Sequence, residues 1–247
     1  MGSAPVVFVL GDLMIDHYLW GRCERISPEA PVQVVDIKEE SLRLGGACNV
    51  MANLRALDAN VLACGVVGDD EGASQLKDML QNIGVDISGV FEEAGRKTTK
   101  KSRIIANHQQ VIRVDRESSD SISADSEIKI IDFLKDRLDS ITLCLISDYG
   151  KGVLSDSLTK EVIDMCKSAG KKVLIDPKGK DYSKYRGGFL ITPNKKEASI
   201  ATGIDINSDE SLKSAGVKLQ ESLGLEYAII TLSEDGMAIF DKQNMIK

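Results

Sequence analysis

The stretch KVLIDPKGK (residues 172–180), together with FLITPNKKE (residues 189–197), decides the fold class. Each stretch contains a short apolar run of the kind found in strands buried on both faces, and each run ends in a cluster of polar residues. In an open α/β sheet the ligand crevice lies beyond the carboxyl ends of the parallel strands. The two clusters therefore predict a binding site at that edge of the sheet, for a phosphorylated small molecule.

Similar apolar runs recur along the chain and alternate with stretches of helical character. Ser155 and Ser208 are well suited to cap two of these helices. Such alternation predicts βαβ units and a parallel sheet with right-handed crossovers. The predicted strands are residues 6–10, 61–63, 143–146, 173–175, 189–191 and 228–232, and the predicted helices are residues 47–57, 73–82, 126–138, 155–168 and 208–223.

Two segments, residues 17–44 and 96–116, do not fit this alternation. They contain prolines and half-buried strand patterns such as residues 32–37 and 111–114. We interpret them as a small antiparallel sheet that projects from the main domain. Because an uncovered sheet needs a partner, this sheet is expected to act as a lid or as a dimer surface.

Composition excludes several classes of function. The 247 residues carry a net charge of -7 with no basic block, which disfavours nucleic-acid binding. No apolar stretch is long enough to span a bilayer, and the first apolar run lacks the basic residues of a secretory signal. The five widely spaced cysteines show no paired metal spacing, so we expect reduced core thiols in a cytoplasmic protein.

A glycine and two carboxylates follow the first apolar run, at Gly11, Asp12 and Asp16. Ionised carboxylates accept hydrogen bonds and therefore suit the hydroxyl groups of a sugar. The alternative interpretation, a glycine turn followed by two solvated acids, is about as well supported.

Gly45 and Gly46 open the predicted helix that contains Asn49. Two glycines let the backbone approach a ligand closely, and the start of a helix offers unpaired N–H groups to oxygen atoms. In the alternative, the glycines belong to an ordinary loop and Asn49 is part of the helix cap. The chain has neither the dinucleotide-binding glycine fingerprint nor a Walker A loop.

Charged side chains follow two of the later strands. Asp148 comes directly after residues 143–147, and Lys178 comes shortly after Asp176. An acid at the end of a strand can orient a metal ion or a substrate, and a lysine there can neutralise phosphate charge during transfer. The alternative is that these are turn residues and an exposed lysine.

Asn194 and Glu197 stand three residues apart at a helix start and therefore share one face. Glu197 is suited to holding Mg²⁺ through water, with Asn194 contacting phosphate, although capping of the helix by Asn194 is a competing interpretation. Further on, the turn that contains Thr231, Ser233 and Gly236 is suited to cupping a nucleotide, but it is also compatible with a plain hairpin.

A local basic cluster lies in the second lid segment. Arg103 with Lys101 is a candidate clamp for a phosphate carried by the substrate, although such a cluster is by default a solvated face. His17 and His108 have no Ser or Cys partner in a recognisable motif, so hydrolase chemistry gains no support.

Taken in order, these clusters resemble the ribokinase-like (PfkB) sugar kinases, from nearly one end of the chain to the other. Within that family the sequence motifs are most similar to those of the bacterial heptose-7-phosphate kinases. That similarity rests on RISPEAP (residues 25–31), SDYGKG (residues 147–152), DPKG (residues 176–179) with Asp181 and Tyr185, and TPNKKE (residues 192–197).

The resemblance implies a doubly wound α/β domain with a β lid. From the uncovered sheet of that lid we expect a homodimer that forms through it. It implies transfer of the γ-phosphoryl group of ATP, with Mg²⁺, to the anomeric C1 hydroxyl of D-glycero-D-manno-heptose 7-phosphate, in heptose synthesis for lipopolysaccharide. By the same resemblance the sugar site would contain Asp12, Asp16, Gly45, Gly46 and Asn49, with Arg103, Asp148 and Lys178 as further candidates. The ATP site would contain Asn194, Lys195, Lys196, Glu197, Thr231, Ser233 and Gly236.

The chain departs from the family at one point. Family members carry a Gly-Ala-Gly-Asp motif whose aspartate takes the proton from the sugar hydroxyl, and no such motif occurs in residues 1–247. We therefore expect residues 1–247 to be a single, truncated kinase domain that is essentially inactive as it stands. A kinase for another sugar and a catalytically silent sugar-binding or scaffold domain remain as alternatives.

Overall fold

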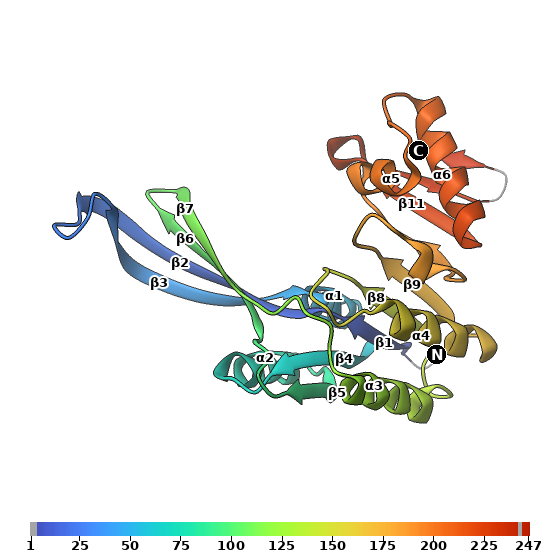
Figure 1. The fold of residues 1–247 in the computed structure, drawn as a ribbon, viewed down its shortest axis with the longest axis horizontal. Helices are drawn as coiled ribbons and strands as arrows, with labels where there is room; N and C mark the ends of the chain where they lie inside the picture. Colours follow the sequence, from blue (N-terminus) through green and yellow to red (C-terminus); the bar gives the residue numbers. More distant parts are fainter. Residues whose placement is uncertain (1–3, 242–243) are drawn as a thin grey trace.

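The computed structural model describes residues 4–241 and 244–247 (Figure 1). Within these residues the larger sheet has nine strands in the order β13-β12-β11-β10-β9-β8-β1-β4-β5. All neighbours pair in parallel except β11 with β12 and β12 with β13. The bounds are β1 Val6–Gly11, β4 Asn60–Gly68, β5 Asp86–Glu93, β8 Leu143–Ser147, β9 Lys172–Asp176, β10 Leu190–Ile191, β11 Tyr227–Thr231, β12 Met237–Phe240 and β13 Met245–Ile246. The predicted α/β class and mostly parallel sheet are confirmed.

Helices cover both faces of this sheet. Five of them begin at a residue whose side chain accepts a hydrogen bond from the first turn, including the predicted caps Ser155 and Ser208. The bounds are α1 Ala47–Ala56, α2 Glu71–Asn82, α3 Ala124–Arg137, α4 Asp156–Ser168, α5 Lys195–Thr202 and α6 Asp209–Leu223. None of the helices in the described residues is long and apolar enough to cross a membrane.

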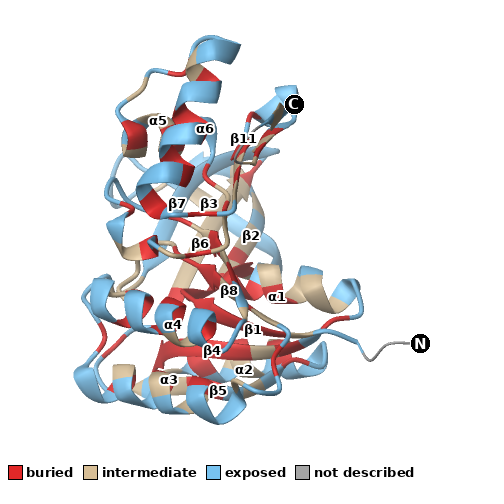
Figure 2. Ribbon diagram, turned by 90° about the vertical axis from the view of Figure 1, so that its right-hand side faces the viewer, coloured by how far each residue is buried: buried red, intermediate tan, exposed pale blue. Residues whose placement is uncertain are grey.

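The alternation of side chains along β1 explains why its sequence is apolar throughout. Phe8 and Leu10 pack into a core with α3, α4, α5 and α6, whereas Val7 and Val9 pack into a second core with α1 and α2. Figure 2 shows the central strands of the larger sheet coloured mostly as buried. A strand buried on both faces has no polar side to show, and this is the arrangement that the predicted parallel sheet requires.

A second, smaller sheet projects from the main body as a long arm (Figure 1). Its strands are β2 (Leu13–Ile26), β3 (Gln33–Gly46), β6 (Thr99–Ala106) and β7 (Gln109–Arg116), in the order β3-β2-β6-β7. β2 with β3 and β6 with β7 form antiparallel hairpins, and β2 pairs in parallel with β6. The lid segment predicted at residues 17–44 falls within the first hairpin, and β2 and β3 reach further back into the main body. The segment predicted at residues 96–116 contains the second hairpin, which begins at Thr99.

The cysteines and histidines have structural environments. Cys48, Cys64, Cys144 and Cys166 are buried, and no cysteine in the described residues is in a disulfide. His17 is buried in the lid between Ser102 Oγ, at 2.9 Å, and Glu40 Oε1, at 2.6 Å. The expectation of core thiols is confirmed for these four cysteines but not for Cys23, which is partly buried in lid strand β2, and the expectation of a structural role is confirmed for His17.

Candidate active site

A cavity of about 530 Å³ opens at the carboxyl ends of β8, β9, β10 and β11. Its volume lies in the range that small-molecule sites occupy. The two polar clusters that the sequence places after β9 and β10 meet in it, as predicted. Its polar lining consists of Asp148, Tyr149, Asp176, Lys178, Thr192, Asn194, Glu197 and Thr231.

The start of α5 contributes Asn194 and Glu197 to the cavity through a capping box. Asn194 Oδ1 accepts a hydrogen bond from Glu197 N at 2.9 Å, and Glu197 Oε2 accepts one from Asn194 N at 3.1 Å. The capping interpretation of Asn194 is therefore confirmed. The second oxygen, Glu197 Oε1, lies 2.8 Å from Lys178 Nζ, so Glu197 also forms an ion pair with a side chain that lines the cavity.

Asp176 lines the same cavity at the end of β9 but was not included among the candidate site residues. Its side chain makes no hydrogen bond within the described residues. Burial, reinforced by the negative charge of Glu197 and opposed by Lys178, raises the pKa of Asp176 to about 6. The signal that could have selected it is its position, because it ends a parallel strand at the predicted edge of the sheet.

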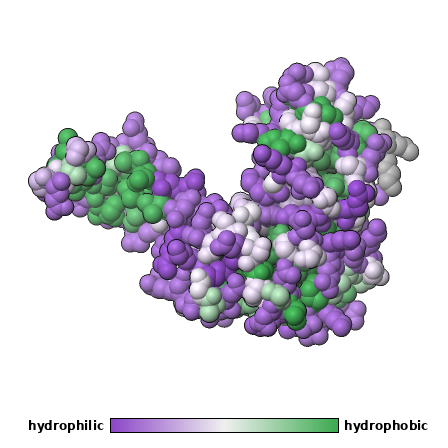
Figure 3. Space-filling model, in the orientation of Figure 1, coloured by the Kyte–Doolittle hydropathy of each residue, from purple (hydrophilic) through white to green (hydrophobic). Residues whose placement is uncertain are grey.

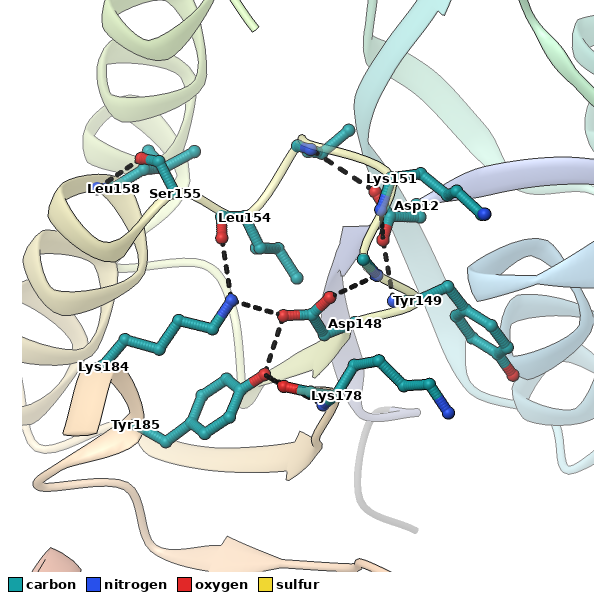
Figure 4. Close-up of polar contacts among 12 residues, drawn as sticks. Asp12, Asp148, Tyr149, Lys151, Leu154, Ser155, Leu158, Lys178, Lys184 and Tyr185 are labelled. Atoms are coloured by element: carbon teal, nitrogen blue, oxygen red, sulfur yellow. Dashed lines mark hydrogen bonds and ion pairs between the residues drawn. The ribbon is translucent and has the colours of Figure 1, made fainter. Parts of the chain in front are cut away.

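Asp148 lines the cavity, but its carboxylate is held by protein groups (Figure 4). Oδ1 accepts a hydrogen bond from Gly150 N at 2.7 Å. Oδ2 accepts from Tyr185 Oη and from Lys184 Nζ, each at 2.7 Å. This geometry favours a role for Asp148 in fixing the surrounding loops rather than in contacting a ligand.

Asp12 has a similar internal role. Its side chain is buried, and its oxygens accept hydrogen bonds from Tyr149 N at 2.7 Å, Lys151 N at 3.1 Å and Val153 N at 3.4 Å (Figure 4). Burial raises the pKa of Asp12 despite these donors. Asp12 therefore organises the loop after β8, and its predicted contact with sugar hydroxyls is not supported by its surroundings.

Asp16 and Arg103 form an ion pair at the base of the lid. Asp16 Oδ1 lies 2.6 Å from Arg103 Nη1, and both side chains are partly exposed. Gly45 lies against this pair, because a Cβ atom on Gly45 would come within 2.6 Å of Asp16 Oδ2. Three of the predicted sugar-site residues are thus brought together, and Gly45 is required by the close approach of Asp16.

The start of α1 differs from the starts of the other α-helices in the described part of the chain. Its N-cap, Gly46, has a φ of 52° and no side chain caps the helix. Asn49 is exposed in the first turn, so the interpretation of Asn49 as a cap is wrong. An uncapped helix start leaves N–H groups for an oxygen-rich ligand.

Tyr149 lies near the carboxylates of the cavity and also near Asp16 at the base of the lid. It lines the cavity together with Val50 of α1. Burial raises the pKa of Tyr149, and the nearby charges of Asp176, Asp16 and Glu197 raise it further. The carboxylates of the cavity and the carboxylate at the lid base therefore both act on this one hydroxyl group.

Four of the residues predicted for the ATP site do not line the cavity. Lys195 and Lys196 are exposed in the first turn of α5. Ser233 lies in the short 3₁₀ helix η2 (Ser233–Asp235), and Gly236 closes the turn between β11 and the antiparallel β12. That turn is a hairpin, and of its predicted residues only Thr231 lines the cavity.

The family follows from a comparison of the whole chain with known proteins. The family model described as pfkB family carbohydrate kinase matches residues 5–247. The chain belongs to the pfkB family of carbohydrate kinases. The resemblance noted in the sequence is therefore confirmed.

Curated relatives are similar over almost all of this chain. The bifunctional protein HldE of Helicobacter hepaticus is 57% identical over 243 residues, which cover 98% of this chain and 50% of that protein. The bifunctional protein HldE of Wolinella succinogenes is 56% identical over 238 residues, which cover 96% of this chain and 50% of that protein. The chain spans about half the length of these relatives.

Solved structures of the pfkB fold are similar in shape. Arabidopsis thaliana ribokinase, solved with ribose and ATP, has a TM-score of 0.74 at 18% identity and covers 99% of this chain and 77% of its own. Phosphofructokinase-2 from Escherichia coli, solved with substrates and products, has a TM-score of 0.77 at 15% identity and covers 99% of this chain and 78% of its own. At these identities the likeness establishes the fold.

Proposed function

We propose that this protein is an ATP-dependent kinase that phosphorylates the anomeric C1 hydroxyl of D-glycero-D-manno-heptose 7-phosphate. The product would be the 1,7-bisphosphate, a precursor of ADP-heptose and lipopolysaccharide. The observation that carries this proposal is the match of 56–57% identity with HldE proteins over nearly the whole chain. A cavity lined by charged side chains at the expected edge of the sheet, large enough for a small molecule, supports it. Since ATP is a cytoplasmic reactant, we expect the protein to act in the cytoplasm.

The cavity residues suit the phosphates of ATP. Lys178 supplies a cation at the rim, and Asn194 and Thr231 supply polar groups beside it. Asp176 and Glu197 supply carboxylate oxygens, which are the ligands that Mg²⁺ prefers, and we assign Glu197 to hold the ion through water. The ion would neutralise charge on the transferred phosphoryl group. No group of three or more metal-ligating side chains occurs in the described residues.

The lid base suits the sugar phosphate. Asp16 offers a carboxylate to sugar hydroxyl groups, and the uncapped start of α1 after Gly46 offers backbone N–H groups. Arg103 can exchange part of its contact with Asp16 for the phosphate of the substrate, because a guanidinium pairs well with phosphate oxygens. The group that removes the proton from the acceptor hydroxyl is left unassigned among residues 1–247.

A substrate panel tests this proposal. The protein, produced from its complete gene, would be incubated with Mg-ATP and heptose 7-phosphate, fructose 6-phosphate or ribose in turn, and ADP release would be measured. We expect kcat/KM for heptose 7-phosphate to exceed the other values by at least about 100-fold, since a site built to hydrogen-bond one sugar leaves polar groups unpaired with another. A preference for another acceptor would assign the protein to a different sugar. Ligand binding without turnover would favour a silent binding domain.

We also propose that the lid is the contact surface of a homodimer. Apolar side chains are exposed on its strands, and Figure 3 shows them gathered on the projecting arm. A contiguous exposed apolar patch favours association. Sedimentation of the wild-type protein should give a dimer, and the exposed substitution Ile112→Asp should shift it to monomer. A monomeric wild-type protein would contradict this assignment. The exposed apolar residues of the lid include Trp20, Ile37, Val111, Ile112 and Val114.

A further inference from the structure

The hydroxyl group of Tyr185 connects the loops that follow two neighbouring strands. Tyr185 lies in the short helix η1 (Ser183–Tyr185), and its side chain is completely buried. Its hydroxyl donates to Asp148 Oδ2 at 2.7 Å, in the loop after β8, and accepts from Lys178 N at 3.0 Å, in the loop after β9 (Figure 4). Burial and the charge of Asp148 raise the pKa of Tyr185, so the hydroxyl keeps the proton that it donates.

The Asp148 carboxylate, which accepts the hydrogen bond from Tyr185, is held firmly by other protein groups. Lys184 Nζ donates both to Asp148 Oδ2 at 2.7 Å and to Leu154 O at 2.9 Å. The Asp148 side chain is 2% exposed and its other oxygen is held by Gly150 N. A buried ion pair with its remaining positions hydrogen-bonded has one favoured arrangement, so the Tyr185 hydroxyl has a fixed partner.

The loop that contains Lys178, in contrast, has little packing of its own beyond the buried Pro177. Gly179 follows Lys178 with a φ of 99°, and a Cβ atom there would meet no other atom within 4 Å. Within the described residues, Lys178 N donates to the Tyr185 hydroxyl at 3.0 Å, and Lys178 O lies 3.2 Å from the same oxygen, whose single proton goes to Asp148 Oδ2 at the shorter distance of 2.7 Å. The Lys178 side chain is half-exposed and reaches into the cavity, where it pairs with Glu197. The position of the ammonium group therefore depends on the backbone contact with Tyr185.

We propose that Tyr185 is a positioning residue that holds Lys178 in place for the phosphates of the nucleotide, with Asp148 and Lys184 as its anchor. This inference rests on the proposed phosphoryl transfer. Tyr185 touches neither substrate. Its hydroxyl sets the backbone of residue 178, and a displacement of about 1 Å at a reacting centre can lower a rate by as much as 10²-fold.

A double-mutant cycle tests the proposal. Tyr185→Phe should lower kcat about tenfold and weaken Mg-ATP binding, measured by calorimetry, while KM for the sugar phosphate stays within about twofold. In a Lys178→Ala background the same substitution should change kcat and Mg-ATP affinity by less than about twofold. Equal losses in both backgrounds, or no loss in the wild-type background, would overturn the proposal.

The chain offers a matched control. Tyr182 packs edge-on against Tyr185 with 5.5 Å between ring centroids, and its buried hydroxyl has no hydrogen-bond partner in the described residues. Tyr182→Phe should leave kcat and Mg-ATP affinity unchanged. If Tyr185→Phe does not fold, Gly179→Ala replaces it, because an alanine is strained at that φ and should shift the same loop with the same loss. Unchanged kcat and affinity in Gly179→Ala would then overturn the proposal.

The two hypotheses fail differently. If the wild-type protein transfers no phosphate to the sugar phosphate, the proposed function fails, and the Mg-ATP binding cycle still decides the role of Tyr185. If transfer is observed but the cycle shows no coupling between Tyr185 and Lys178, the positioning role alone fails.

Discussion

Lys178 Nζ lies 2.8 Å from Glu197 Oε1, and this ion pair joins the loop after β9 to the first turn of α5 across the cavity. The Lys178 side chain is 50% exposed, so the pair adds little to stability. Glu197 also completes the capping box of α5 with its other oxygen. The two residues thus hold opposite charges at the place where we expect the phosphates of the nucleotide.

Removing the charge of Lys178 should impair transfer far more than folding. Lys178→Met should lower kcat by about 10²-fold, because the ammonium would neutralise charge that develops on the transferred group. Steady-state kinetics with saturating sugar phosphate would measure this. Lys213→Met, on an exposed position of α6, is the control and should leave kcat unchanged. Equal kcat values for Lys178→Met and the wild type would remove Lys178 from the site.

The capping box of α5 should serve both the helix and the site. Asn194→Ala should reduce the free energy of unfolding by about 1 kcal/mol, because Glu197 N loses its hydrogen bond to Asn194 Oδ1. It should also weaken Mg-ATP binding, because the first turn of α5, which carries Glu197, is then held less firmly. Ser208→Ala removes the equivalent capping box of α6, outside the cavity, and should lose a similar amount of stability without any loss of Mg-ATP affinity. Equal Mg-ATP affinities for these two variants would contradict the assignment of α5.

Asp176 should make the protein less stable as the pH rises. Its folded pKa is raised to about 6 from an ordinary value of 3.8, so the folded state binds the proton more tightly than the unfolded state between these values. The free energy of unfolding therefore falls as the pH rises from about 4 to 6. With allowance for solvent screening, Asp176→Asn should add about 1–2 kcal/mol at pH 8.

Urea unfolding at two pH values would measure this effect. The gain in Asp176→Asn should be present at pH 8 and should vanish near pH 3, where the carboxyl group is protonated in both states. A gain of the same size at both pH values would show that the charge of Asp176 is not its cause.

Gly45 should be intolerant of any side chain. Gly45→Ala would place a Cβ atom 2.6 Å from Asp16 Oδ2, so Asp16 must move and the KM for the sugar phosphate should rise at least about tenfold. Gly170→Ala, where a Cβ atom would meet nothing within 4 Å, is strained only by its φ of 69° and should lose about 1 kcal/mol of stability with no change in KM. Equal KM values for the two variants would argue against a sugar site at Asp16.

Much of the fold could be predicted because the buried strands and the helix starts have recognisable sequence patterns. The apolar runs at β1 and β8 have no polar face, and serines mark the starts of α4 and α6. β5 was not among the predicted strands, since its sequence DISGVFEE mixes polar residues and a glycine at the edge of the sheet. The parallel pairing of β2 with β6 joins segments far apart in the chain and has no local signal.

The site was predicted as a set of strand ends but not as a network. Sequence position placed Asp148, Lys178 and Glu197 at one edge of the sheet, and they do lie there. The sequence could not show that the carboxylate oxygens of Asp12 and Asp148 accept hydrogen bonds from protein groups. Those donors lie in loops whose course depends on tertiary contacts. The assignments of Asn49, Lys195, Lys196, Ser233 and Gly236 to ligands stay predictions, as does the absence of the proton acceptor from residues 1–247.

The position of the transferred phosphate tests the central claim most directly. Phosphorus NMR of the protein produced from its complete gene, with Mg-ATP and heptose 7-phosphate, should show a new resonance coupled to the anomeric proton, in step with the formation of ADP and with the 7-phosphate retained. Phosphate on any other hydroxyl, or no new sugar phosphate while Mg-ATP and the sugar phosphate are both bound, would contradict the proposed C1 kinase.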